Sequence, residues 1–241
     1  MNRTRFARTT LWSLLVTVLV ALAAGLLAPG PPASSAEPGP AAAAAPAAVP
    51  AHQHGAAPVP RTPAQVALHD QMRKLWEDHI TWTRLAIVTF ADGSGGFAAT
   101  ADRLLRNQVD IGNAIKPFYG QAAGNRLTAL LHEHITIAVE VLQAAKAGDD
   151  AAFTAATARW YANANDVADF LSAANPRFWP RRVLRASMKT HLDQTLTEAA
   201  HELQADFTAS VADYEAVHTH ILAMADLLSG GIVAQFPARF R

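Results

Sequence analysis

Apolar side chains recur every three or four positions from residue 63 to the C-terminus, which is the spacing of one face of an α-helix. No segment of this part alternates apolar and polar residues with a period of two over the length of a strand. Ala, Leu and Arg, which favour helices, are frequent. The pattern therefore predicts an all-α fold.

Glycines and prolines interrupt the helical pattern and set the predicted helix limits. The predicted helices are 63–91, 97–116, 121–147, 150–174, 180 to about 206, and 209–229. Pro117 separates the second helix from the third, and Gly230 and Gly231 end the last one. Because the connections are short, we expect an antiparallel bundle of about six helices. Phe236 and Phe240, in the proline-broken end of the chain, are expected to pack back on this bundle.

Two stretches of the chain repeat one another: His134 lies 55 residues after His79, and Arg159 lies 56 residues after Arg103. The matching residues of the later part of each copy are Arg103, Asn107 and Asp110 in the first, and Arg159, Asn163 and Asp166 in the second. A third copy keeps His191, Asp226 and Pro237 but lacks the Arg and the Asn. The repeat predicts two clear αα-hairpins and one degenerate hairpin, each with a His in its first helix.

The three polar residues of each clear copy are spaced i, i+4, i+7, which places them on one stripe of their helix. Apolar neighbours such as Leu104 and Val167 indicate that this stripe borders the core. In a first interpretation the stripe is structural: it fixes the helix register by hydrogen bonds, and each Arg pairs with the Asp that follows it. Loss of Asp110 or Asp166 would then leave a buried Arg unpaired and cost about 3 kcal/mol.

In a second interpretation, imidazoles from facing helices hold a metal ion in the bundle core. His79 lies three residues from Trp76 and from Trp82, so it is expected to point inward, and His134 has apolar neighbours. With His191 they are the candidate ligands of a divalent metal ion. The chain lacks the Glu-x-x-His pairs of carboxylate-bridged iron sites, and paired Asp residues are poor ligands, so the histidines are the better candidates.

Catalytic motifs are missing from the sequence. It contains no phosphate-binding Gly-x-x-x-x-Gly-Lys, no Gly-x-Ser-x-Gly, no His-Glu-x-x-His and no dinucleotide fingerprint, and it offers no catalytic or cofactor-binding residue. The residues therefore favour a non-enzymatic binding or interaction module. A metal-binding protein is the alternative, and a metal-dependent hydrolase, which requires a water-accessible cavity at the histidines, comes third.

The N-terminal 36 residues differ from the rest. Three arginines within the first eight residues precede an apolar run over 11–27, and small residues follow at 34–36, a pattern typical of a secretory signal peptide. The 17 apolar residues also approach the length needed to cross a bilayer, so an uncleaved N-terminal anchor is the alternative. In both cases we expect the protein outside the cytoplasm, secreted or anchored to the outer face of the cytoplasmic membrane.

Residues 37–62 are rich in Ala and Pro and predict a disordered tether, which leaves 63–241 as the helical domain. The tether carries His52 and His54, which offer a weak Cu(II) or Zn(II) site. The full chain has 20 basic and 20 acidic residues. Without the three arginines of the first 36 residues the balance is 17 to 20, a net charge of −3, which excludes nucleic acid as an expected partner. The absence of cysteine excludes disulfides and thiolate ligands.

Four motifs between about residues 66 and 240 resemble a family of uncharacterised, exported bacterial helical proteins. They are Trp76–Arg84 (WEDHITWTR), Asn107–Gly112 (NQVDIG), Leu130–Ile135 (LLHEHI) and Gln235–Pro237 (QFP). Some members carry the label acetylglutamate kinase, which implies an α/β fold with glycine-rich phosphate loops. The present chain is predicted to be helical and lacks such loops, so kinase activity is not supported. The resemblance implies no catalytic residue.

Overall fold

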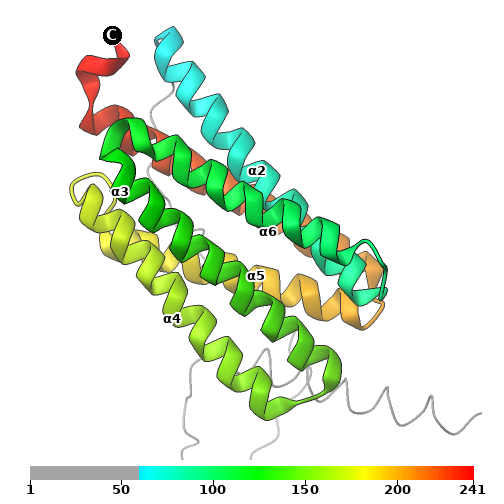
Figure 1. Ribbon diagram of the computed structural model, residues 1–241. Helices are drawn as coiled ribbons and strands as arrows, with labels where there is room; N and C mark the ends of the chain where they lie inside the picture. The colour runs from blue at the N-terminus through cyan, green and yellow to red at the C-terminus, as the bar shows by residue number, and fades with distance from the viewer. Residues whose placement is uncertain (1–59) are drawn as a thin grey trace, which may run out of the picture. The chain divides into compact units, whose positions relative to one another are not determined.

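The computed structural model describes residues 60–241, and this part of the chain contains five α-helices, one 3-10 helix and no strand (Figure 1). The elements are α2 (Pro63–Ala91), α3 (Phe97–Ala147), α4 (Asp150–Ala174), α5 (Arg181–Leu203), α6 (Phe207–Gln235) and η1 (Pro237–Phe240). The prediction of an all-α fold is confirmed. The predicted signal peptide, and residues 37–59 of the predicted tether with His52 and His54, lie outside the described residues.

Side-chain caps start three of the helices. Thr62 accepts a hydrogen bond from the backbone N–H of Gln65 at the start of α2, and Asp149 and Asp206 accept equivalent bonds at the starts of α4 and α6. These oxygens satisfy N–H groups that have no partner within the helix. Gly148, in the left-handed conformation at φ 69°, ends α3. Local signals of this kind explain why the predicted limits of α2 and α4 agree with the structure.

Helix α3 covers the predicted helices 97–116 and 121–147 as two helical arms joined through non-helical backbone at Gly120, so the described residues form five α-helices rather than six. It continues through Pro117 and bends at Gly120, whose φ of 85° and ψ of 168° are accessible to glycine. Its two arms fold back on each other (Figure 1). They meet closely at Gly112, where an added Cβ would lie 2.6 Å from the carbonyl oxygen of Gly124. Pro117 thus lies close to the bend in the sequence, but the backbone conformation of Gly120, three residues later, produces the bend.

Helix α6 also differs from the prediction, because it continues past Gly230 and Gly231 to Gln235. Gly231 is a packing position: a Cβ there would lie 2.0 Å from Nε1 of Trp179. The chain then forms η1, and the rings of Phe236 and Phe240 lie 5.9 and 5.7 Å from that of Phe118. The C-terminal phenylalanines therefore pack on the bundle as expected.

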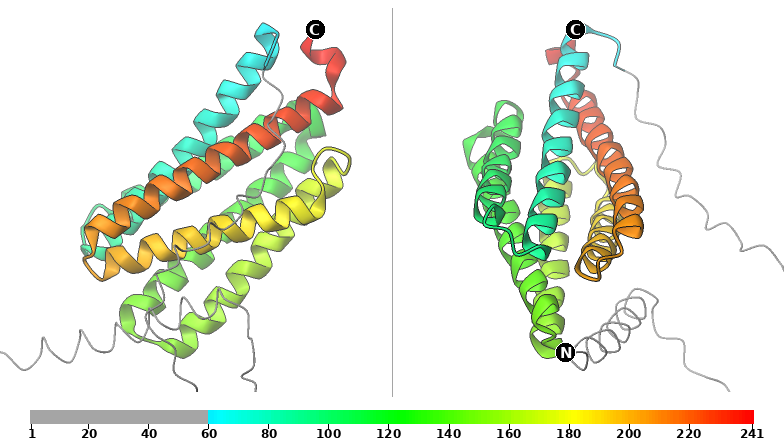
Figure 2. Two further views of the ribbon diagram at one scale, coloured as in Figure 1. Left: turned by 180° about the vertical axis from the view of Figure 1, so that it is seen from behind. Right: turned by 90° about the vertical axis from the view of Figure 1, so that its right-hand side faces the viewer.

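Helices adjacent in the sequence pack against each other, and α6 also packs against α2, so the five helices surround one core (Figure 2). Among the described helices only α6 is long and apolar enough to cross a membrane, judged by length and composition. Its Val217, Ile221 and Ile232 are fully buried in the bundle. These features are those of a core helix, for which the same composition is expected.

Candidate functional site: a histidine-lined cavity

The three candidate histidines come together in the core. His79 on α2, His134 on α3 and His191 on α5 are each no more than 3% exposed. The ring centroids of His79 and His191 are 5.7 Å apart, and those of His134 and His191 are 6.4 Å apart. We refer to these three residues as the histidine cluster.

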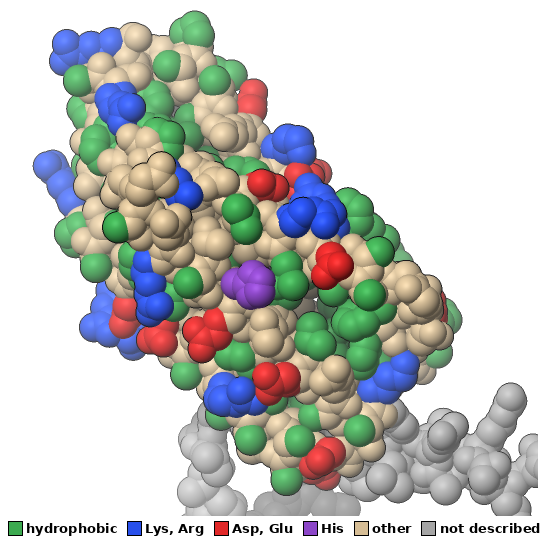
Figure 3. All heavy atoms as spheres, viewed as in Figure 1, with side chains coloured by type: hydrophobic (Ala, Val, Ile, Leu, Met, Phe, Trp, Pro, Cys, Tyr) green, Lys and Arg blue, Asp and Glu red, His purple; other side chains and the backbone are tan. Residues whose placement is uncertain are grey.

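The histidine cluster lines a cavity of about 50 Å³. The rest of the wall is mostly apolar and comes from α2, α3, α4 and α5, with Ile87, Leu104, Ile135, Trp160 and Thr195 among its residues. A water molecule needs at least roughly 10–15 Å³ of such volume, so the cavity has room for a few waters or for one metal ion with a water ligand. Organic ligands of ordinary size need several hundred Å³. On the face shown in Figure 3, hydrophobic side chains surround a hollow over α3.

The hydrogen bonds of Asn163 fix the ring of His134. The Asn163 amide nitrogen donates to the carbonyl oxygen of Leu130 at 3.2 Å, so its Oδ1 faces His134 Nδ1 at 2.8 Å. Nδ1 must therefore carry the proton and donate. Nε2 of His134 then holds a lone pair, and this buried atom has no hydrogen-bond partner within residues 60–241. A ring held in this way by a carbonyl oxygen is oriented like a metal-ligating histidine.

The other two rings are held differently. Nδ1 of His79 accepts from the amide nitrogen of Gln108 at 3.2 Å, and the same nitrogen donates to Leu104 O at 2.8 Å. Nδ1 of His191 is buried and has no hydrogen-bond partner in the described part of the chain. Thr195, one turn after His191 on α5, donates to the backbone oxygen of His191 and makes no hydrogen bond to its ring. The histidine cluster thus contains two rings with defined partners and one without.

Burial keeps the histidine cluster neutral. Desolvation, assisted by the nearby His134, lowers the pKa of His79 to about 3. Desolvation also lowers the pKa of His134 to about 4, and it lowers that of His191 well below its usual value, with smaller contributions from neighbouring histidines. At neutral pH all three imidazoles are therefore uncharged, which is the form that binds metal ions.

The predicted polar stripe divides between core and surface. Asn107 and Asn163 are buried, whereas Asp110, Arg159 and Asp166 are exposed. The stripe is wider than the contact between two helices: residues three or four positions from each Asn are rotated away from it by about 40° to 60° at 3.6 residues per turn. Only the central Asn of each stripe is therefore buried between the helices.

The predicted pairing of each Arg with its following Asp is wrong. Arg103 lies 3.6 Å from Asp78, measured between Nη2 and Oδ2, and its guanidinium stacks 5.2 Å from the ring centroid of Trp82. Arg159 pairs with Glu140. This pair lines an open groove of about 420 Å³ between α3 and α4, together with Glu133 and Asp166.

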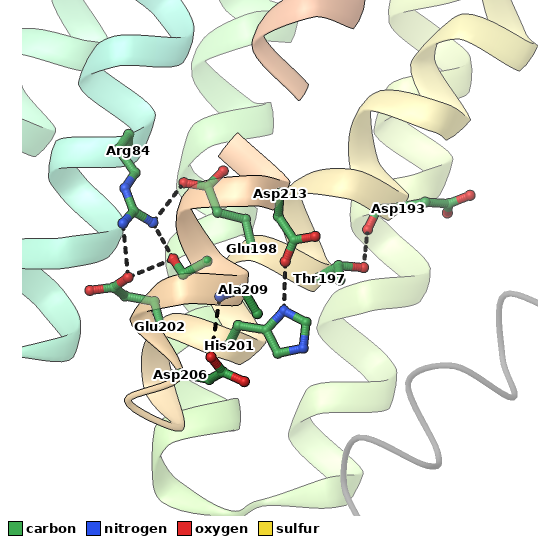
Figure 4. Close-up of polar contacts among 10 residues, drawn as sticks. Arg84, Asp193, Thr197, Glu198, His201, Glu202, Asp206, Ala209 and Asp213 are labelled. Atoms are coloured by element: carbon green, nitrogen blue, oxygen red, sulfur yellow. Dashed lines mark hydrogen bonds and ion pairs between the residues drawn. The ribbon is translucent and has the colours of Figure 1, made fainter. Parts of the chain in front are cut away.

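A buried ionic network that sequence reasoning missed lies two turns along α5 from His191 (Figure 4). Arg84 donates to Glu198 Oε1 at 3.2 Å and pairs with Glu202 Oε2 at 3.0 Å. Ser210 accepts from Arg84 and donates to Glu202 at 2.6 Å. We call Arg84, Glu198, Glu202 and Ser210 the arginine network. Burial raises the pKa of Glu198 to about 7 despite the opposing charge of Arg84.

The histidine cluster is not assembled as a complete metal site. Among the described residues, no group of three or more His, Asp or Glu side chains is placed to hold one ion as the side chains stand. The structure brings His79, His134 and His191 together around the cavity, but as they stand they do not form a ligand set.

The chain matches no protein-family model, no curated protein and no solved structure. Within the described residues, the histidine cluster is a buried group at a cavity with nitrogen atoms of His134 and His191 that have no hydrogen-bond partner.

Proposed function

We propose that the protein is an exported binding module that holds one transition-metal ion between His79, His134 and His191. The observation that carries this proposal is the buried Nε2 of His134, which has no partner in the described chain while Asn163 fixes the opposite side of the ring. A buried polar atom without a partner costs about 1–3 kcal/mol, and coordination to a metal removes that cost.

The donor set defines the class of ligand. Three imidazoles suit Zn(II), Cu, Ni and Fe ions and do not suit Mg(II) or Ca(II), which prefer oxygen. His134 and His191 offer a nitrogen without a partner among the described residues, whereas His79 must release the proton on Nε2 to bind while Nδ1 accepts from Gln108. The cavity has room for one such ion with a water, and its volume is well below that of an organic-ligand site. None of the described residues that line it is Asp or Glu. A metal-bound water would therefore lack a carboxylate base at its side, which favours binding over hydrolysis.

The proposal includes the three related αα-hairpins that the sequence predicts, each supplying one ligand. Three contacts between helices support it: Asn107 Nδ2 to Leu75 O at 3.0 Å, Asn163 Nδ2 to Leu130 O at 3.2 Å, and His220 Nε2 to Ser187 O at 2.9 Å. In each case the carbonyl belongs to the residue four positions before His79, His134 or His191. His220 thus occupies in the third hairpin the place of the asparagines.

The setting of this module is also part of the proposal. We place the protein outside the cytoplasm, secreted or held by its N-terminal apolar segment, with no nucleic-acid partner. We also propose that it belongs to the family of exported bacterial helical proteins that its motifs resemble. The acidic balance of the chain beyond residue 36 supports the absence of a nucleic-acid partner. The lack of phosphate-binding loops supports a binding role rather than kinase activity.

Metal analysis of the full chain tests the proposal. The protein is purified without a histidine tag and with His52→Gln and His54→Gln, which remove the second candidate metal site. Titration with Zn(II) or Cu(II) is expected to give one equivalent per chain and to raise the thermal midpoint. His134→Gln should abolish both effects, and His132→Gln, an exposed position two residues away, should change neither. Absence of stoichiometric metal, or equal binding by His134→Gln, would overturn the proposal.

A further inference from the structure

We infer that His191 binds the metal ion through Nδ1, whereas His134 binds it through Nε2, and that His220 is the positioning residue that leaves Nδ1 of His191 available. This inference rests on the proposed function and names the ligand atoms of the same site. It follows from a comparison of the second and third hairpins, which place different residues beside the core histidine.

In the second hairpin the asparagine has two roles. Its amide nitrogen binds the carbonyl of Leu130, and its amide oxygen accepts from His134 Nδ1. Nδ1 of His134 is thereby occupied, and Nε2 is the nitrogen that can bind a metal. A side-chain amide has both a donor and an acceptor at one end, so one asparagine can perform the two roles at once.

In the third hairpin an imidazole stands in that place. His220 directs Nε2 to the backbone oxygen of Ser187 at 2.9 Å, with the Ser187 hydroxyl at 3.4 Å. This contact reproduces the first role of the asparagine. The second role is not reproduced, because His191 Nδ1 is buried and has no partner among residues 60–241.

The available nitrogen is therefore on opposite sides of the two rings. It is Nε2 in His134 and Nδ1 in His191, and both are buried side chains that line the same cavity. Rotation of the His191 ring breaks no hydrogen bond at Nδ1, whereas rotation of His134 would break its bond to Asn163. The site is thus completed most easily by turning His191, which explains why no ligand set is assembled in the present arrangement.

The substitution His220→Asn tests the inference, because it gives the third hairpin the asparagine of the other two. An amide oxygen beside Nδ1 of His191 would compete with the metal for that nitrogen. We expect the Kd for Zn(II) to rise at least tenfold while the apo protein keeps its thermal midpoint. His218→Asn is the matched control: His218 is on the same helix, pairs with exposed Glu77, and its loss should leave the Kd unchanged.

Imidazole ¹⁵N resonances of the full chain provide a second measurement that needs no variant. On addition of Zn(II), the Nδ1 signal of His191 and the Nε2 signal of His134 should move to the range of coordinated nitrogen. If His191 shifts at Nε2, or if His220→Asn binds Zn(II) as tightly as or more tightly than the wild type, the inference is wrong. The proposed function would still hold in that case, since it fails only if the unsubstituted protein binds no stoichiometric metal.

Discussion

The core contains two buried polar clusters that both join α2 to α5. They limit the desolvation cost of their polar groups in opposite ways. In the arginine network, Arg84 on α2 lies between Glu198 and Glu202 on α5, and Ser210 on α6 closes the arrangement. Opposite charges meet between α2 and α5, and a neutral hydroxyl from α6 bonds to both. The histidine cluster contains no opposite charges, and its rings stay neutral because burial disfavours their protonated form.

This difference separates a structural cluster from a candidate binding site. Every member of the arginine network has at least one ionic or hydrogen-bond partner within it, and the guanidinium is needed to compensate two carboxylates. The histidine cluster leaves buried nitrogens of His134 and His191 without a partner in the described chain, next to a cavity. In the arginine network opposite charges compensate each other within the protein, and among its described atoms Glu198 Oε2 lacks a hydrogen-bond partner. The histidine cluster has no such opposite charge, which makes it the candidate for an external ligand.

The largest effect is expected from removing the cation of the arginine network. Arg84→Met leaves two buried carboxylates without their counter-charge and should lower the free energy of unfolding by about 4 kcal/mol at pH 7.5. Urea denaturation followed by circular dichroism measures this loss. Arg73→Met is the matched control, because Arg73 is also on α2 and makes two bonds to Asp226 of α6 but is more exposed. Its loss should cost less than about 1 kcal/mol. Equal losses in the two variants would remove the distinction between a buried and a surface pair.

The second prediction concerns pH. The unfolded chain protonates its histidines near pH 6.5, while His79 and His134 stay neutral in the fold down to about pH 3 and 4. Their lowered pKa values therefore contribute stability that is present above pH 6.5 and is lost as the pH falls. Between pH 6.5 and 5 each histidine should account for about 2 kcal/mol. Urea titrations at pH 7, 6 and 5 should show this decline, and it should be about 1 kcal/mol per pH unit shallower in His134→Gln.

Glu198 provides a control of opposite sign. Its pKa rises from 4.5 to about 7 on folding, so the folded state holds a proton that the unfolded state has released. This contribution is present below pH 4.5 and is lost as the pH rises towards 7. Glu198→Gln should therefore become more stable relative to the wild type as the pH rises from 5 to 7. A steeper acid-induced decline in His134→Gln, or no pH-dependent difference in Glu198→Gln, would contradict the assignment of the two clusters.

Local patterns in the sequence predict much of the fold and the members of the histidine cluster. The spacing of His79 between Trp76 and Trp82 predicts an inward direction because a helix face repeats every 3.6 residues. Capping residues and Gly148 give helix limits for the same local reason. The bend at Gly120 depends instead on a backbone conformation with φ 85°, and the role of Gly231 depends on Trp179 opposite it, and periodicity contains neither.

The parts that sequence reasoning missed depend on which helices become neighbours. The arginine network joins residues more than a hundred positions apart, and the only local signal is the i, i+4 spacing of Glu198 and Glu202 on a buried face of α5. His220 aligns with Asn163 at the offset of 57 that relates His191 to His134. The two residues are unlike, so a comparison of residue identities does not pair them. In the structure each bonds a backbone oxygen four positions before a core histidine.

The smallest predicted effect concerns the aspartates of the polar stripe. If each Asp were buried next to an Arg, its loss would lower the free energy of unfolding by about 3 kcal/mol. Asp110 and Asp166 are exposed instead. Asp110→Ala and Asp166→Ala should therefore each change the free energy of unfolding by less than about 0.5 kcal/mol. Asn163→Ala should cost about 2 kcal/mol, because it leaves the buried Nδ1–H of His134 without an acceptor. Urea denaturation of the three variants compares these positions directly. A loss near 3 kcal/mol in either Asp variant would mean that the whole stripe is structural. The expected ranking instead assigns its contribution to the asparagines, each of which bonds a backbone carbonyl one turn before a core histidine.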